Sequence, residues 1–383
     1  MEKLRVLHVI GGLNVGGSQS VVLNLYKNVD REKIQFDFII DEPNQLFYKE
    51  MVEEMGAKVF VLPKLKGFNV FKVKRAWRKF FKEHPEYKIL HSHVRSYASI
   101  YISIAKKFGV KTIIHSHSTS NGKGVTAIIK KILQRPLRRK ADYLMAWSTE
   151  AGRWLYGEKA CKKDNYIFLP NAINVSSYVF DEDVRRDYRA KLCVEGKFVI
   201  GHAGRLSTPK NHLFLLEVFS EVLKVRKNAV LLLAGDGPLR AQIESKIKEL
   251  KISSSVIMLG ARDDVNKLYC AMDVFAFPSL WEGLPVVIVE AQVSGLTCLM
   301  SDKVNKDVDL TSLVKRLSIE DKKAWVDSLA NFNAERLNVV SEIEKRGFDI
   351  KYTANKIINF YFEILKKNYE NYVLHKLYSS RWR

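Results

Sequence analysis

The amino-acid sequence predicts an α/β protein of two doubly wound domains in tandem, each a parallel sheet wrapped by helices. Short β-rich apolar runs alternate with longer stretches of helical period along the chain, which is typical of strand–helix–strand crossovers. The chain has 383 residues, well above the roughly 150 of a typical domain, so two domains with an appendage are expected.

The first series of elements occupies the N-terminal half. Strands are expected to begin at Leu4, Phe36, Lys58, Ile89, Thr112 and Tyr143. Amphipathic segments lie between them, at about 18–28, 45–55, 70–83, 96–108 and 123–139. Because each segment is long enough for a crossover helix, residues 1–180 are expected to form one Rossmann-like domain.

The second series starts at Phe198, with further strands expected at 230–234, 256–259, 274–277 and 297–300. It predicts a second Rossmann-like domain over residues 181–350, with a hinge in the charged stretch 180–196. One long helical pattern begins at 349, so residues 351–383 are expected to form a C-terminal helix, returning to the first domain, and a basic aromatic tail. Open parallel sheets bind ligands at the carboxyl ends of their strands, so the ligand is expected in the cleft between the domains.

The charge of the chain favours a polyanionic partner. Lys and Arg number 63 against 42 Asp and Glu, a net charge of +21. Residues 1–180 hold 31 of these basic side chains and 15 of the acidic ones, so most of the excess lies in the first domain. No recognition-helix or zinc-finger signature accompanies the charge, so no nucleic acid is expected as a partner.

Two basic segments suit an anionic membrane surface. In the helix expected over 71–82, four apolar residues share one side and six cations surround them, as in helices that lie on lipid. The same helix could instead bury its aromatic side chains on the sheet, and both readings stay open. A second basic cluster lies at 130–140.

Several features indicate a cytoplasmic protein, peripheral on the inner face of the membrane. No apolar run reaches the roughly 18–20 residues that cross a bilayer, and residues 1–10 lack the layout of a signal peptide. The four cysteines lie far apart without a Cys-x-x-Cys pair, so they are interpreted as reduced thiols.

A glycine-rich turn at residues 11–18 joins the first strand to its helix. Glycines there allow a backbone to approach a ligand, and the helix start attracts phosphate. A simple tight turn is the alternative. The spacing is not Gly-x-Gly-x-x-Gly, which disfavours a dinucleotide-dependent oxidoreductase.

Two further stretches carry charged residues at strand ends. The loop after the strand at 198 contains Arg205 and Lys210, two cations that could neutralise a diphosphate or simply be solvated. The stretch from Phe277 to Ala291 contains Glu282 and Glu290, eight positions apart. Glu290 stands in an apolar run, where an unpaired carboxylate is costly, so a protein donor or ligand hydroxyls must partner it.

Together these motifs resemble the retaining glycosyltransferases of family 4, which have the GT-B fold. The resemblance rests on the two glutamates, the Gly-Arg loop with Lys210 and Asn211, the Gly-Asp-Gly-Pro at 235–238, and the Ala-Met-Asp-Val at 271–274. The N-terminal glycine turn and the stretches after it are similar to the bacterial branch that builds exopolysaccharide and capsule. The resemblance covers about residues 4–300.

The resemblance implies a role for each matching residue of the second domain. Arg205 and Lys210 would bind the donor diphosphate, and Glu290 would accept from the ribose hydroxyls. Glu282, a catalytic residue, would engage the donor sugar together with the backbone of Gly283 and Leu284.

In the first domain, Gly16 and Gly17 would close on the phosphates. His117 matches the histidine near the reacting sugar and is the second catalytic candidate. His115 is interpreted as a core or outer partner, and His91 and His93 line the same edge.

The resemblance also implies the chemistry. The anomeric configuration would be retained, no protein general base is assigned, and neither a metal ligand nor a cofactor is predicted. The acid-x-acid triplets at 181–183 and 307–309 are interpreted as solvated loop acids. The stretch 303–307 and Gln19 depart from the usual pattern of relatives, which leaves phosphate contacts there and acceptor detail open.

The leading hypothesis is a retaining, metal-independent hexosyltransferase. It would move a sugar from a nucleotide-sugar donor, a UDP-sugar, to a lipid-linked or growing glycan acceptor. One alternative is a nucleotide-sugar epimerase of the same fold. Another is a non-catalytic protein that binds the membrane surface.

Overall fold

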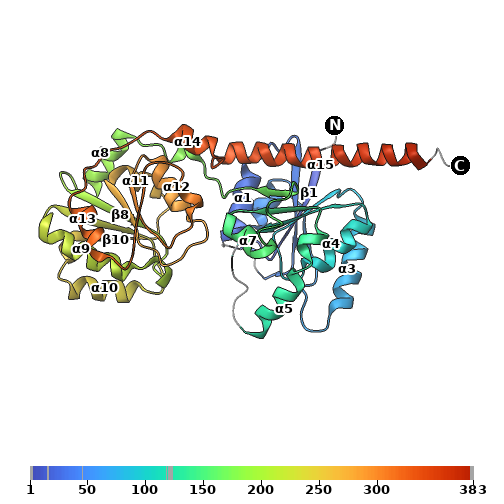
Figure 1. Cartoon of the computed structure of the whole chain (residues 1–383), viewed down its shortest axis with the longest axis horizontal. Helices are drawn as coiled ribbons and strands as arrows, with labels where there is room; N and C mark the ends of the chain where they lie inside the picture. Colours follow the sequence, from blue (N-terminus) through green and yellow to red (C-terminus); the bar gives the residue numbers. More distant parts are fainter. Residues whose placement is uncertain (1–2, 15–16, 45, 118, 120–123, 380–383) are drawn as a thin grey trace. The chain divides into compact units, whose positions relative to one another are not determined.

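A computed structural model describes residues 3–14, 17–44, 46–117, 119 and 124–379, with side chains left out at 17, 18 and 367–379. The chain forms two compact units: residues 1–171 together with 350–383, and residues 172–349 (Figure 1). The sequence placed the boundary at 180/181, and the units meet in sequence at 171/172. Each unit is described by itself.

Among the described residues, seven parallel strands form the N-terminal sheet, in the order β3-β2-β1-β4-β5-β6-β7. They are β1 (Leu4–Ile10), β2 (Ile34–Ile40), β3 (Val59–Val61), β4 (Ile89–Ser92), β5 (Lys111–Ser116), β6 (Tyr143–Ala146) and β7 (Tyr166–Phe168). β7 was not predicted, because three half-buried residues make no recognisable apolar run. The alternation of strands and helices otherwise matches the predicted α/β class.

Helices cover both faces of this sheet. They are α1 (Gly17–Asn28), α2 (Lys49–Glu54), α3 (Val70–Glu83), α4 (Ala98–Lys107), α5 (Val125–Gln134), α6 (Leu137–Lys140) and α7 (Thr149–Tyr156). The helix predicted over 123–139 is divided in two near Pro136, which lacks the N–H that would continue it. α3 buries Val73, Trp77, Phe80 and Phe81, so the face that could have met lipid packs inside the unit.

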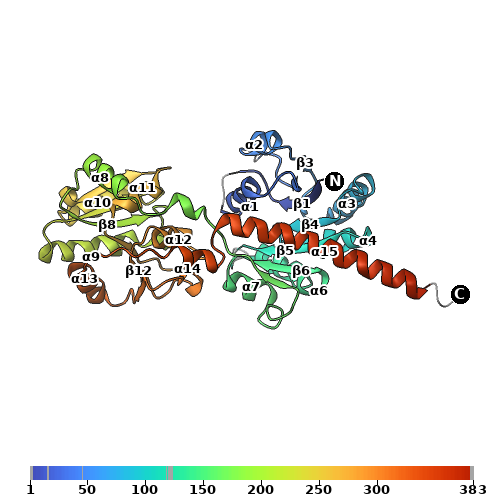
Figure 2. The ribbon, with the colours of Figure 1, turned by 90° about the horizontal axis from the view of Figure 1, so that it is seen from above.

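The last helix, α15 (Ile350–Ser379), returns to the N-terminal unit as predicted (Figure 2). Ile357, Ile358, Tyr361 and Ile364 are buried along one side of it. The Tyr361 hydroxyl lies 2.6 Å from Nδ1 of His91 on β4. This helix therefore completes the core of the first unit.

The second unit has six parallel strands among its described residues, in the order β10-β9-β8-β11-β12-β13. They are β8 (Phe198–Ala203), β9 (Ala229–Ala234), β10 (Val256–Gly260), β11 (Val274–Phe277), β12 (Cys298–Ser301) and β13 (Val314–Leu317). Its helices are α8 (Glu182–Lys191), α9 (His212–Val225), α10 (Arg240–Glu249), α11 (Val265–Ala271), α12 (Val286–Val293), α13 (Lys322–Ala330) and α14 (Val340–Lys345). Lys315 and Arg316 interrupt the apolar pattern of β13, which explains why it was not predicted.

The predicted hinge at 180–196 is wrong, because most of this stretch is α8. Asp181 caps the helix by accepting from the backbone N–H of Val184. Arg185 of α8 donates to Asp273 at 2.6 Å and fixes the helix to the unit. The two acidic triplets are likewise not simply solvated, since Asp309 of the second triplet pairs with Arg316 at 2.8 Å.

In both sheets the strand order reverses beside the first strand, between β1 and β4 and between β8 and β11. At this point the connections that follow the two neighbouring strands run to opposite sides, and ligands of doubly wound folds bind in the crevice between them. None of the described helices has the length and apolar character needed to cross a bilayer.

Candidate active site

Two loops meet at the strand-order reversal of the second unit. The loop after β8 leads through a short 3-10 turn, Thr208–Lys210, into α9, and the loop after β11 leads into α12. Leu280 N–H donates to the Pro209 carbonyl at 2.8 Å, and the Asn211 amide donates to the Pro278 carbonyl at 3.2 Å. These two hydrogen bonds hold the loop that carries Lys210 next to the loop that carries Glu282.

Lys210 and Glu282 form an ion pair across these loops. The Lys210 ammonium nitrogen lies 2.7 Å from Glu282 Oε1, and the two side chains are 16% and 15% exposed. The ammonium also lies 4.6 Å from the centroid of the Phe277 ring, a cation–π contact. Glu282 Oε1 has no hydrogen-bond partner among the described residues besides this ion pair, so this oxygen keeps acceptor capacity for a ligand.

Glycines allow a third loop to approach the first. A Cβ on Gly237, after β9, would lie 2.5 Å from the Leu206 carbonyl oxygen, and one on Gly235 would lie 2.0 Å from that of Gly204. Cβ atoms do not approach backbone this closely, so side chains are excluded at both positions. The Gly-Asp-Gly-Pro motif therefore brings the β9 loop against the loop that carries Lys210.

The remaining predicted donor residues are more open. Arg205 is exposed and makes no ion pair with any residue that the structure describes. A Cβ on Gly283 would meet nothing within 4 Å, and Leu284 is partly buried against the core of the unit. Open space at Arg205 and Gly283 is consistent with a ligand there.

Buried polar atoms without partners gather behind these loops, and sequence reasoning missed them. His202 Nε2, both ring nitrogens of His212 and Ser279 Oγ have no hydrogen-bond partner among the described residues. The two rings stack edge to face at 4.6 Å. Burial, and then the neighbouring Lys210, lowers the pKa of His212 to about 4. The sequence feature that could have revealed this group is His202, a histidine within the apolar run of β8.

Glu290 lies on α12 and has protein donors. The Tyr269 hydroxyl donates to Glu290 Oε2 at 2.8 Å, and the Tyr178 hydroxyl also bonds the carboxylate. Burial raises the pKa of Glu290, although both hydroxyls oppose that shift. The carboxylate therefore has the partners that the sequence led us to expect, and they are two tyrosines that the sequence did not single out.

The N-terminal candidates lie in the other unit. Gly16 lies outside the described residues, and Gly17 is the first residue of α1. His117 follows β5, and its Nε2 lies 2.8 Å from Nδ1 of His93. Burial and the charge of Arg95 hold the pKa of His117 well below its usual value, so the ring is neutral at pH 7.

Comparisons with known proteins agree with this geometry. Residues 15–177 match the model of Glycosyltransferase Family 4, and residues 197–332 match that of Glycosyl transferases group 1. A putative glycosyltransferase of Bacillus subtilis, EpsF, is 32% identical over 93% of this chain and 96% of its own length. An Escherichia coli galactosyltransferase that uses UDP-Gal and a GlcNAc-diphosphoundecaprenol is 23% identical over 95% of the chain and 98% of its own.

Two solved structures share the fold. A glycosyltransferase of Rickettsia africae superposes with a TM-score of 0.77, at 16% identity, over 96% of this chain and 100% of its own. Anabaena HepE, solved with UDP, gives 0.69, at 18% identity, over 99% and 100%. The two doubly wound units and the matches to glycosyltransferase models and relatives identify a glycosyltransferase of the GT-B fold. The chain belongs to glycosyltransferase family 4.

Proposed function

We propose that this chain transfers a sugar from a UDP-sugar to a lipid-linked or growing glycan in cell-surface polysaccharide biosynthesis. The observation that carries the proposal is the Lys210–Glu282 pair, which is fixed by two loops at the carboxyl edge of the sheet. It offers a cation to a diphosphate and a carboxylate to sugar hydroxyls, the two parts of a sugar-nucleotide donor.

The relatives support the choice of donor and acceptor. The E. coli galactosyltransferase is named for a UDP-sugar and an undecaprenol-linked acceptor. CapH of Staphylococcus aureus, which is 21% identical over 94% of this chain, is named for capsular polysaccharide biosynthesis. HepE supports only the fold at 18% identity, so the UDP assignment depends mainly on the galactosyltransferase.

The chemistry follows from the charges. Two oxygens of the leaving diphosphate would bind Lys210 and the exposed Arg205, which lowers the energy of the departing anion in place of a divalent cation. Displacing the carboxylate partner of Lys210 frees its ammonium for phosphate. Glu282 then accepts from sugar hydroxyls, with Gly283 and Leu284 offering backbone N–H groups, and Glu290 accepts from the ribose.

The proposed stereochemistry is retention of the anomeric configuration, as the family resemblance implies. The acceptor oxygen would attack the face from which the diphosphate leaves, and the departing phosphate would take the acceptor proton. His117 would lie beside the reacting sugar as a neutral hydrogen-bonding group, and Gly16 and Gly17 would contact the phosphates.

The proposal includes peripheral contact with an anionic membrane through α5. Val125, Ile128, Ile129 and Ile132 on this helix are each more than half exposed, and residues 111–141 contain eight Lys and Arg but no Asp or Glu. Such a helix buries apolar side chains in lipid while its cations attract acidic headgroups. A pocket of about 790 Å³ beside α5, lined in part by Arg135, Arg138 and Trp154, could admit an acceptor headgroup.

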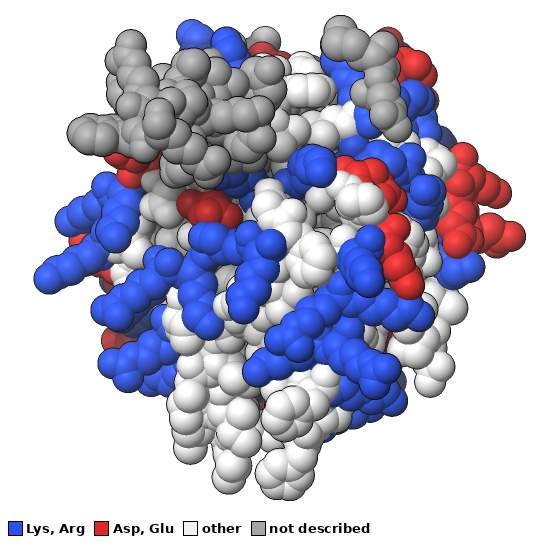
Figure 3. All heavy atoms as spheres, turned by 90° about the vertical axis from the view of Figure 1, so that its right-hand side faces the viewer, with Lys and Arg blue, Asp and Glu red and all other residues white. Residues whose placement is uncertain are grey.

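The charge distribution supports this contact. Figure 3 shows Lys and Arg side chains gathered over one face of the molecule, with few Asp and Glu among them and uncharged side chains projecting beyond. Attraction to acidic lipid is worth about 1 kcal/mol for each cation near the surface. A peripheral protein would thereby concentrate where a lipid-linked acceptor lies.

The test is transfer from radiolabelled UDP-sugars to a lipid extract by the purified chain. We expect label in the lipid phase with the wild type and at least a 100-fold lower rate with Lys210→Ala. Lys224→Ala is the matched control, because this exposed lysine of α9 pairs only locally with Glu221. Equal rates for both variants would contradict the proposal. A UDP-sugar epimer formed without acceptor, identified by NMR, would show an epimerase instead.

A further inference from the structure

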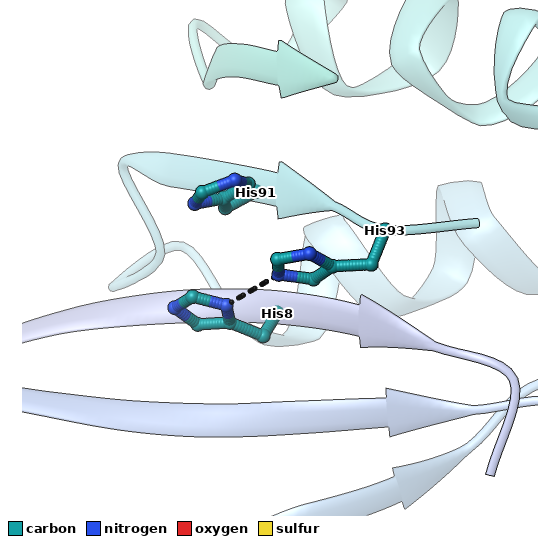
Figure 4. A group of neighbouring side chains, drawn as sticks. All are labelled: His8, His91 and His93. Atoms are coloured by element: carbon teal, nitrogen blue, oxygen red, sulfur yellow. Dashed lines mark hydrogen bonds between the residues drawn. The ribbon is translucent and has the colours of Figure 1, made fainter. Parts of the chain in front are cut away.

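Five histidines lie side by side where β1, β4 and β5 end in the N-terminal unit. His8 is on β1, His91 and His93 are on and just after β4, and His115 and His117 are on and just after β5. His8, His91 and His115 are fully buried or nearly so, and His93 and His117 are partly buried. Figure 4 shows the rings of His8, His91 and His93 close together, with His93 turned toward His8.

The rings form two hydrogen-bonded rows. In the first, His8 Nδ1 lies 3.0 Å from His93 Nε2, and His93 Nδ1 lies 2.8 Å from His117 Nε2. In the second, the Tyr361 hydroxyl lies 2.6 Å from His91 Nδ1, and His91 Nε2 lies 3.1 Å from His115 Nδ1. His115 Nε2 and His117 Nδ1 have no partner among the described residues.

We propose that His93, His115 and His117 bind a divalent transition-metal ion of the zinc class. One ring nitrogen from each of the three lies within 4.8 Å of the other two. Two nitrogens bound to tetrahedral zinc at about 2.0–2.1 Å are about 3.3 Å apart. The His93–His117 pair must therefore open by roughly half an ångström, and His115 must close in, movements that side-chain rotation can supply.

The protons of the network can be placed so that all three ligands are free. His93 keeps its proton on Nε2 and donates to His8 Nδ1, which leaves Nδ1 of His93 for the metal. His115 keeps its proton on Nδ1 and donates to His91 Nε2, which leaves its unpartnered Nε2. His117 carries its proton on Nδ1 in the metal-bound form, which leaves Nε2. The proton that makes the His93–His117 hydrogen bond in the metal-free protein therefore moves to the other nitrogen of its ring when the metal binds. No ring has to lose or gain a proton, because each neutral imidazole has one donor and one acceptor.

His8, His91 and Tyr361 then act as outer partners. Metal-bound histidines usually donate their other N–H to a second group, which fixes the tautomer and the orientation of the ring. His8 would accept from His93, and His91 would accept from His115 and donate to the Tyr361 oxygen. Such outer partners typically contribute 10–100-fold to metal affinity.

The donor set selects the ion. Three neutral imidazoles, with no carboxylate or thiolate in the group among the described residues, suit zinc, cobalt, nickel or copper rather than magnesium or calcium. Three protein ligands leave a fourth position for water or an anionic oxygen. This site belongs to the N-terminal unit, whereas Arg205 and Lys210, which would neutralise the diphosphate, belong to the other.

The test is a titration of the full, tag-free, chelator-treated chain with CoCl2, followed by visible absorption and then by displacement with ZnCl2. We expect one ion per chain with the intense absorption of four-coordinate cobalt. His117→Asn and His115→Asn should each lower the affinity at least 100-fold, and His8→Gln 10–100-fold. His84→Gln is the matched control, because this ring bonds only Glu86 at the surface.

Circular dichroism of the metal-free variants shows whether they fold. If His115→Asn does not fold, His117→Asn decides the question, since His117 is half-buried at the edge of the group. Less than 0.1 ion per chain, or equal affinity in wild type and folded His117→Asn, would overturn the proposal and leave the rings sharing protons alone. The titration contains no sugar donor and no glycan acceptor, so its outcome does not depend on the outcome of the transfer assay.

Discussion

The Lys210 ammonium lies 2.7 Å from Glu282 Oε1, although 72 positions separate the two residues in sequence. One comes from the loop after β8 and the other from the loop after β11. The carboxylate that pairs with the lysine in the free protein holds the cation in place, and under the proposed function it gives way to phosphate when the donor binds. The first prediction follows from this exchange.

The double variant Lys210→Met/Glu282→Gln should lose little more activity than either single variant. Each single change should lower kcat/KM for the donor at least 100-fold, because in the proposed function both residues contact one ligand. A double-mutant cycle of transfer rates measures this coupling. Losses that multiply would mean that the two residues act independently.

Gly237→Ala should lower the stability of the protein, whereas Gly283→Ala should weaken its use of the donor. A methyl group on Gly237 meets the Leu206 carbonyl at 2.5 Å, so the loop must move and the melting temperature should fall. A methyl group on Gly283 meets nothing within 4 Å, so stability should stay the same while donor KM rises. Thermal melts and donor kinetics on both variants check this, and the reverse result would refute it.

Tyr269→Phe should weaken nucleotide binding about 10-fold. The change removes the hydroxyl that donates to Glu290 Oε2, so the carboxylate proposed to accept from the ribose is less fixed before binding, and ordering such a side chain costs about 0.5–1.5 kcal/mol. Titration calorimetry with UDP measures the affinity. Tyr188→Phe is the control, since its hydroxyl bonds Asp264 elsewhere in the same unit, and it should bind UDP as the wild type does.

His212 should make the protein less stable in mild acid. Its pKa is about 4 in the folded protein against an ordinary 6.5, so between these values the unfolded chain binds a proton that the folded chain excludes. Stability is complete above pH 6.5 and falls as the pH drops toward 4, by ~2 kcal/mol at pH 5. His212→Gln should remove this acid-dependent loss of stability. The melting temperature of the variant should therefore drop less between pH 7 and pH 5 than that of the wild type. Equal drops would contradict the prediction.

Serine in place of Ile128 and Ile132 should reduce binding to vesicles that contain phosphatidylglycerol by at least 10-fold. Each isoleucine is more than half exposed, and burying one in lipid contributes up to about 2 kcal/mol. Co-sedimentation at two salt concentrations measures binding, which should weaken with salt. Val225→Ser, at an exposed residue of the other unit, is the control. Unchanged binding in the Ile128/Ile132 variant would exclude α5 as the contact.

The sequence predicted the parts of the fold and site that local pattern encodes. Strand–helix alternation predicted both sheets, and the motifs around Lys210 and Glu282 marked both as site residues, but the ion pair between them was not predicted. Tyr269 and Ser279 carry no local signal, because their role depends on which loops fold against each other. α8 was mistaken for a hinge because its charged surface pattern resembles a linker, whereas its cap and its arginine contacts are tertiary.

The return of α15 has a consequence for biosynthesis. Residues 172–349 are continuous, so the second unit can fold as soon as it leaves the ribosome, in keeping with domain-by-domain folding. The first unit must wait, because Tyr361, which caps the histidine row at His91, is made nearly 200 residues after its last strand. The unit that is synthesised first is therefore completed last. Until α15 is made, its core stays incomplete, and this incomplete core is the surface that a nascent-chain chaperone would bind.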